Sequence, residues 1–188
     1  CTQDSTQVID PEFAYYGPIG FDVGSFIANL LFAFFSQDGH STKADDRQVA
    51  QKWLAQCMVD TWQLFQTKFL ARWSARSAEG GENAAYPAML FGQDAGGAAS
   101  LEAAQSAYMA DLFRDTLGFC GAEMIRRIVG IAHVEDLESI PDQEARGVCE
   151  KRSMRLARKL LVLKDAGCAD IQAVVAAAYA ERQDGASC

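Results

Sequence analysis

The chain has 188 residues, 49% of them apolar, which is enough for one compact domain with a sizeable core. Its formal net charge of -8 argues against a sequence-independent nucleic-acid binder, which needs a basic surface. The polar N-terminus lacks the apolar core of a secretory signal, and the most apolar stretch, residues 26–35, is too short to cross a bilayer. We therefore expect a soluble protein without a nucleic-acid or membrane partner.

The first residues predict a strand and then a loop. The chain begins with Cys1 and a hydrophilic run without a helix start signal, so we expect an upstream part of the domain to be missing. Residues 7–10 read as the end of a short buried strand, because the β-branched pair Val8 and Ile9 leads to the charged Asp10. Pro11 and the glycine- and proline-rich residues 17–20 then predict a loop.

Two long helices are expected next. Asp22 is a plausible N-cap for a helix to about Gln37 that is apolar all round, as in a central buried helix. Residues 44–76 carry a second helical pattern with apolar positions every four residues. We assign its three tryptophans to the core: Trp53, Trp62 and Trp73. Residues 77–97 are rich in glycine and alanine and predict a surface loop, within which residues 86–91 could pack as a short element.

The remainder of the chain also has helical patterns. Ser100 is expected to cap a stretch that runs to Ile131, and its glycines at 118, 121 and 130 predict a break or close packing. Further helices are expected over residues 141–164 and 170–181. The basic cluster on the first of these reads as a solvated face: Arg152, Arg155, Arg158 and Lys159. No domain linker is visible, so residues 1–188 are expected to form a single, mainly helical unit.

The cysteines do not form a metal-binding or disulfide pattern. They lack a C-x-x-C pair and stand far in sequence from both histidines: Cys1, Cys57, Cys120, Cys149, Cys168 and Cys188. This spacing indicates reduced thiols in the cytoplasm, with a disulfide as the alternative.

Two carboxylates at the end of the predicted strand are the candidate metal ligands. Asp10 and Glu12 are two residues apart and would project toward the same side. Such a pair suits Mg²⁺ that also holds nucleotide phosphates. The alternative is a pair of exposed loop acids.

The order of these features resembles a known group of enzymes. A strand, D-x-E, a glycine loop and a buried helix starting with aspartate resemble the kinase-like phosphotransferases of small molecules. A closer resemblance is to the methylthioribose kinase family. Three blocks of this sequence carry it: TQDSTQVIDPEFAYYGPIGFDVGSFIANLL, FSQDGH and LGFCGAEMIRRIVGIAHVEDLESI. The resemblance implies an α+β protein-kinase-like fold, of which this chain is mostly the helical C-terminal lobe.

The resemblance also implies roles for individual residues. Asp10 matches the metal-binding aspartate and Glu12 its companion ligand, while Asp22 matches an aspartate that supports the backbone of the catalytic loop. Arg126 and Arg127 match paired arginines that face the substrate and the transferring phosphate.

Other interpretations of these residues remain open. Asp22 could be a plain N-cap, and Glu123 is placed for an ordinary helical ion pair with Arg127. Adjacent helical residues point about 100° apart, so both arginines would reach one ligand only if the helix were distorted. His133 is expected to be a packed core or capping residue rather than a base.

The implied activity is ATP-dependent phosphorylation of 5-methylthioribose to 5-methylthioribose 1-phosphate in methionine salvage, by a Mg²⁺-dependent homodimer. The catalytic loop is expected just upstream of Cys1 and the nucleotide lobe further upstream, so the chain should hold no catalytic residue and be inactive alone. One alternative is a non-catalytic helical interaction module derived from a kinase lobe. Another is a kinase of choline, an aminoglycoside or homoserine, although a cationic acceptor would favour acidic or aromatic walls over two arginines.

Overall fold

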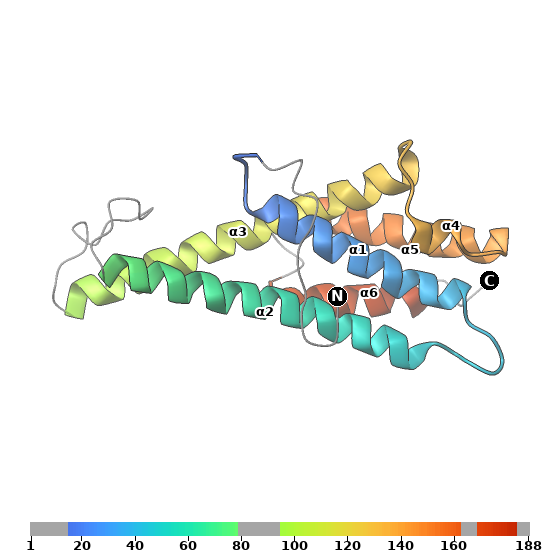
Figure 1. Ribbon diagram of the computed structural model, residues 1–188, viewed down its shortest axis with the longest axis horizontal. Helices are drawn as coiled ribbons and strands as arrows, with labels where there is room; N and C mark the ends of the chain where they lie inside the picture. The colour runs from blue at the N-terminus through green and yellow to red at the C-terminus, as the bar shows by residue number, and fades with distance from the viewer. Residues whose placement is uncertain (1–14, 79–94, 163–168, 184–188) are drawn as a thin grey trace.

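The computed structural model describes residues 15–78, 95–162 and 169–183, and this part of the chain is an assembly of helices without strands (Figure 1). The helices are α1 (Gly20–Gly39), α2 (Gln48–Ala78), α3 (Ala95–Val129), α4 (Glu135–Glu138), α5 (Gln143–Val162) and α6 (Ile171–Gln183). A mainly helical lobe is thus confirmed for the described residues. The predicted strand at residues 7–10 and the possible short element at 86–91 lie outside them.

Helix α1 lies at the centre, as its apolar sequence predicted. It packs against α2, α3 and α5 (Figure 1). Six of its apolar side chains have no solvent exposure: Ile27, Ala28, Leu31, Phe32, Phe34 and Phe35. Neighbouring helices thus cover most of α1, as a helix with apolar residues on nearly all sides requires, although Phe26 is 54% exposed.

The predicted N-cap of α1 is wrong. Ile19 occupies the N-cap position without a side-chain hydrogen bond, and Asp22 lies in the first turn with its side chain exposed. The helix starts earlier than expected because the Phe21 N–H donates to the Pro18 carbonyl at 3.0 Å and so closes a turn before Asp22. In the first turn the Asp22 carboxylate still complements the positive end of the helix dipole.

Small residues bring α3 close to two neighbours. A Cβ on Gly24 of α1 would lie 2.5 Å from the Thr116 carbonyl oxygen, and one on Gly121 would lie 2.7 Å from the Ala157 carbonyl oxygen of α5. Gly118 faces open space. Helix α3 runs unbroken from Ala95 to Val129, so the glycines at 118 and 121 produce no break. At Gly121 the reason is close packing, as one of the two sequence-based alternatives stated.

Aromatic side chains join the distal half of α2 to the first half of α3. These two halves extend together beyond the other helices, at the left of Figure 1. The ring centroids of Trp62 and Phe113 are 4.6 Å apart, and Tyr108 stacks on Phe69 with a centroid distance of 5.7 Å. Trp73 meets Tyr108 edge-on at 5.3 Å. Large rings thus fill the space between two helices with few close backbone contacts.

The core assignment of Trp53 is wrong. Trp62 and Trp73 are 6% and 8% exposed, as predicted, but Trp53 is 65% exposed. A spacing of four residues advances about 40° around the helix at each step, so a long run of such steps winds off the buried face. Burial in α2 instead follows steps of four, three and four residues, from Gln51 through Ala55 and Met58 to Trp62, with Leu54 buried beside this row.

Aspartate side chains cap the starts of α5 and α6, whereas Ser100 does not cap α3. The Asp142 carboxylate accepts the Ala145 N–H at 2.7 Å, and the Asp170 carboxylate accepts the Ala173 N–H at 2.8 Å. Ser100 was predicted to cap α3 but lies inside it, where its hydroxyl donates to the Gly96 carbonyl at 2.8 Å. None of the helices described here has the length and apolar character required to cross a membrane.

Candidate functional site

The two candidate substrate-binding arginines lie at the C-terminal end of α3 and share one carboxylate. Arg126 donates from Nε to Glu123 Oε2 and from Nη2 to Oε1, both at 2.8 Å. Arg127 donates from Nε to Oε1 of the same carboxylate at 3.0 Å. The ion pair between Glu123 and Arg127 is therefore present, and Arg126 joins it.

A regular helix is sufficient for this arrangement. Positions three and four residues after Glu123 lie on either side of it, so the two arginine side chains approach one carboxylate from both sides. The helix continues to Val129 through these residues. The carboxylate on which the two arginines converge belongs to Glu123 and not to a ligand, so the expectation that only a distorted helix would bring both arginines to one ligand stays a prediction.

Opposing effects act on the carboxylate. Burial, the largest of them, raises the pKa of Glu123, but hydrogen bonds and charge from the Arg126 and Arg127 guanidiniums outweigh it and hold that pKa below its usual value. The three groups together carry one net positive charge. They lie in the last turns of α3, where the negative end of the helix dipole also favours cations.

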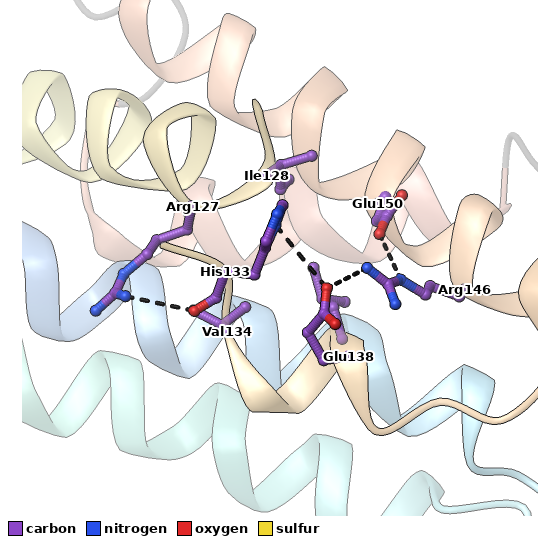
Figure 2. Close-up of a pocket in the computed structure, with 8 residues that line it drawn as sticks. Arg127, Ile128, His133, Val134, Glu138, Arg146 and Glu150 are labelled. Carbon is purple, nitrogen blue, oxygen red and sulfur yellow. Dashed lines mark hydrogen bonds and ion pairs between the residues drawn. The ribbon is translucent and has the colours of Figure 1, made fainter. Parts of the chain in front are cut away.

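Arg127 also holds the segment that follows α3. Its Nη1 donates to the carbonyl oxygens of Ala132 and His133, each at 3.4 Å. The His133 side chain is 47% exposed and its Nδ1 lies 3.9 Å from Glu138 Oε1. The expectation of a packed core position for His133 is wrong, because its ring lies at the surface beside Glu138 while its backbone carbonyl accepts from Arg127 (Figure 2).

Figure 2 shows a shallow concavity beside this segment. It is lined by Arg127, Ile128, His133, Val134, Leu137, Glu138, Arg146 and Glu150. Its volume, about 150 Å³ with the open solvent above it, is below the ~300–1,000 Å³ typical of small-molecule sites. The charged side chains that line it already pair with one another, since Arg146 forms ion pairs with both Glu138 and Glu150. We assign no ligand to it.

The structure does not bring all the predicted site residues together. Asp10 and Glu12 lie outside the described residues. Asp22 is exposed at the start of α1, and within residues 15–78, 95–162 and 169–183 no hydrogen bond or ion pair links it to either arginine. The same part of the chain has no cluster of three or more potential metal ligands.

An ionic cluster around Asp38 was missed by the sequence analysis. Its carboxylate accepts from Arg152 Nη1, from Gln51 Nε2 and from Arg182 Nη2, each at 2.8 Å. Arg152 also donates to the Arg182 carbonyl at 2.8 Å. The cluster joins the C-terminal end of α1 to α2, α5 and α6.

The prediction that the basic residues of α5 form a solvated face therefore holds for only two of the four. Arg155 and Arg158 are exposed, as predicted, but Arg152 is only 11% exposed and Lys159 pairs at 2.5 Å with the buried Glu181. The sequence offered one signal for the ionic cluster, because Asp38 lies within the FSQDGH block that resembles the kinase family, but it did not indicate which residues pair with Asp38.

Several known proteins similar to this chain are methylthioribose kinases. The chain is 49% identical over 160 residues to methylthioribose kinase 1 of Oryza sativa subsp. japonica, a match that covers 85% of the chain and 36% of that protein. It is 39% identical over 161 residues to methylthioribose kinase of Escherichia coli, covering 86% and 37%. The expected resemblance to methylthioribose kinases is confirmed.

These relatives are much longer than the chain. Methylthioribose kinase of Geobacillus kaustophilus is 36% identical over 159 residues, covering 85% of the chain and 34% of its own length. The chain thus spans little more than a third of the kinases it matches. No family model matches the chain.

Proposed function

We propose that this chain is the C-terminal lobe of an ATP-dependent kinase that phosphorylates 5-methylthioribose to 5-methylthioribose 1-phosphate in methionine salvage. The observation that carries the proposal is the match to methylthioribose kinases over 85% of the chain at up to 49% identity. A protein-kinase-like fold for the whole enzyme, a homodimer and a cytoplasmic location belong to the same proposal. Free thiols at Cys57, Cys120 and Cys149 agree with a reducing compartment.

We assign each candidate site residue a role that its side-chain chemistry suits. Asp10 and Glu12 provide the carboxylate oxygens that Mg²⁺ prefers, and they would hold the ion that neutralises the phosphates of ATP. Arg126 and Arg127 offer permanently charged donors to phosphoryl oxygens or sugar hydroxyls. In this proposal Asp22 supports the backbone of the catalytic loop.

The test uses the complete gene product that carries this chain. Replacing Asp10 by asparagine removes one anionic metal ligand while keeping the side-chain size, and should abolish formation of methylthioribose 1-phosphate without changing the melting temperature. Asp60→Asn is the matched control, because Asp60 is exposed on α2 and accepts a hydrogen bond from Gln56 of the same helix. Near-normal turnover by Asp10→Asn would refute the metal assignment. Faster phosphorylation of choline than of methylthioribose would refute the proposed acceptor.

A further inference from the structure

The two arginines differ in how many of their donors are already used. Arg126 gives Nε and Nη2 to Glu123, and its Nη1 makes no hydrogen bond with any residue that the structure describes. Its side chain is 57% exposed. An oxyanion in solvent could therefore approach the edge formed by Nη1 and the second Nη2 hydrogen without displacing a contact.

Arg127 has a different environment. Its Nε bonds Glu123 and its Nη1 bonds two backbone carbonyls beyond the helix end, and its side chain is only 29% exposed. Figure 2 shows the guanidinium reaching from α3 to the His133 carbonyl. A ligand that engaged Nε or Nη1 of Arg127 would have to break contacts that hold the segment after α3.

Glu123 restricts the movement of Arg126. Its carboxylate is 10% exposed, and both oxygens are engaged by guanidinium groups. Two parallel N–H···O bonds fix the plane of the Arg126 guanidinium as well as its position. A long arginine side chain would otherwise sample many rotamers, and ordering it only when the ligand binds would reduce affinity and rate.

We propose that Glu123 is a positioning residue that holds the Nη1 edge of Arg126 ready for a phosphoryl oxygen or sugar hydroxyl of the substrates, while Arg127 anchors the segment after α3. This inference rests on the proposed kinase function and goes beyond it, because it assigns ligand contact to Arg126 rather than to Arg127 and a role to Glu123.

The experiment is a double-mutant cycle in the complete gene product, with kcat and KM for methylthioribose and ATP measured separately. Glu123→Gln keeps the side-chain size but replaces one acceptor with an N–H donor facing a guanidinium. We expect it to lower kcat about 10- to 100-fold, as misplacement of a single donor does. Arg126→Lys should do the same, and the double variant should be no slower than Arg126→Lys alone, because Glu123 acts through Arg126.

The controls separate this role from ordinary stabilisation. Asp111→Asn removes another acid paired with an arginine three residues later on the exposed surface of the same helix, and should leave kcat unchanged. Arg127→Lys should lower the melting temperature more than Arg126→Lys while reducing kcat less. Because Arg126 is largely exposed, comparing these two lysine variants decides the assignment even if Glu123→Gln fails to fold. Glu123→Asp, which keeps the charge, should recover part of the activity lost in Glu123→Gln.

The failures of the two proposals can be distinguished. If the wild-type protein does not phosphorylate methylthioribose, the proposed function and this inference both fall. If the wild type is active but Glu123→Gln has normal kcat, or if the losses in Glu123→Gln and Arg126→Lys multiply in the double variant, the positioning role alone is refuted. A greater loss of kcat in Arg127→Lys than in Arg126→Lys would refute the assignment of ligand contact.

Discussion

Replacing Gly24 by alanine should destabilise the protein, whereas the same replacement at Gly118 should stabilise it. Both glycines lie inside long helices, so alanine gains about 1 kcal/mol of helix propensity at either position. The two sites differ in what surrounds them. A Cβ at residue 118 meets nothing within 4 Å, whereas one at residue 24 would lie 2.5 Å from the Thr116 carbonyl oxygen and 2.9 Å from the Cys120 nitrogen.

The size of the effect follows from which atoms obstruct the new methyl group. Both obstructing atoms belong to the backbone of α3, so they cannot rotate away as a flexible side chain would, and α1 must move. Overpacking in a core costs roughly 1–3 kcal/mol, and we take the upper end for Gly24. After subtracting the helix propensity, Gly24→Ala should cost about 2 kcal/mol and Gly118→Ala should gain about 1 kcal/mol.

Thermal unfolding of the complete gene product measures both effects. A change of 1 kcal/mol shifts the melting temperature by about 2–4 °C in a domain of this size. We therefore expect a decrease of about 4–8 °C for Gly24→Ala and an increase of about 2–4 °C for Gly118→Ala. Shifts of the same sign and similar size in the two variants would show that α1 and α3 are not in the close contact described.

Other predictions concern ionic and thiol groups. Asp38→Asn should destabilise the protein by about 2–3 kcal/mol, because it leaves partly buried guanidiniums without their counter-ion; an additive double-mutant cycle with Arg152→Ala in urea would contradict the pairing. The pKa of Glu123 is lowered on folding, so its contribution to stability is present above the unfolded-state pKa of about 4.3 and lost as the pH falls through the folded-state value. Glu123→Gln should therefore be destabilising at pH 7 in urea unfolding, with a deficit that shrinks as the pH falls below about 4. A deficit that does not change with pH would contradict the depressed pKa. Iodoacetamide should modify the half-buried Cys57 before the fully buried Cys120, and peptide mass mapping that found the reverse order would contradict the packing of α3.

Local patterns predicted the helices well, because each depends on residues close in sequence. Helices α5 and α6 begin within two residues of the expected starts at 141 and 170, and the apolar circumference of α1 predicted its central position. The cap of α1 was mispredicted because a turn at Pro18 starts the helix before Asp22. The four-residue spacing in α2 mispredicted Trp53 because such a row winds around the helix, whereas residues at mixed steps of three and four face the core.

The candidate site was predictable where its contacts are local. Glu123 and Arg127 are spaced for an ion pair, and the spacing to Arg126 allows the second pair as readily. The Asp38 cluster was not predictable, because its carboxylate meets Arg152 and Arg182, which are 114 and 144 residues away in sequence. Only the packing of α5 and α6 against α1 brings these charges together.

The most direct test of the proposed function is an assay of the complete gene product with ATP, Mg²⁺ and 5-methylthioribose, with choline and homoserine as competing acceptors. The account predicts ATP-dependent formation of methylthioribose 1-phosphate in preference to any other phosphorylated product. Phosphorylation of another acceptor alone, or no transfer by the folded protein, would contradict it.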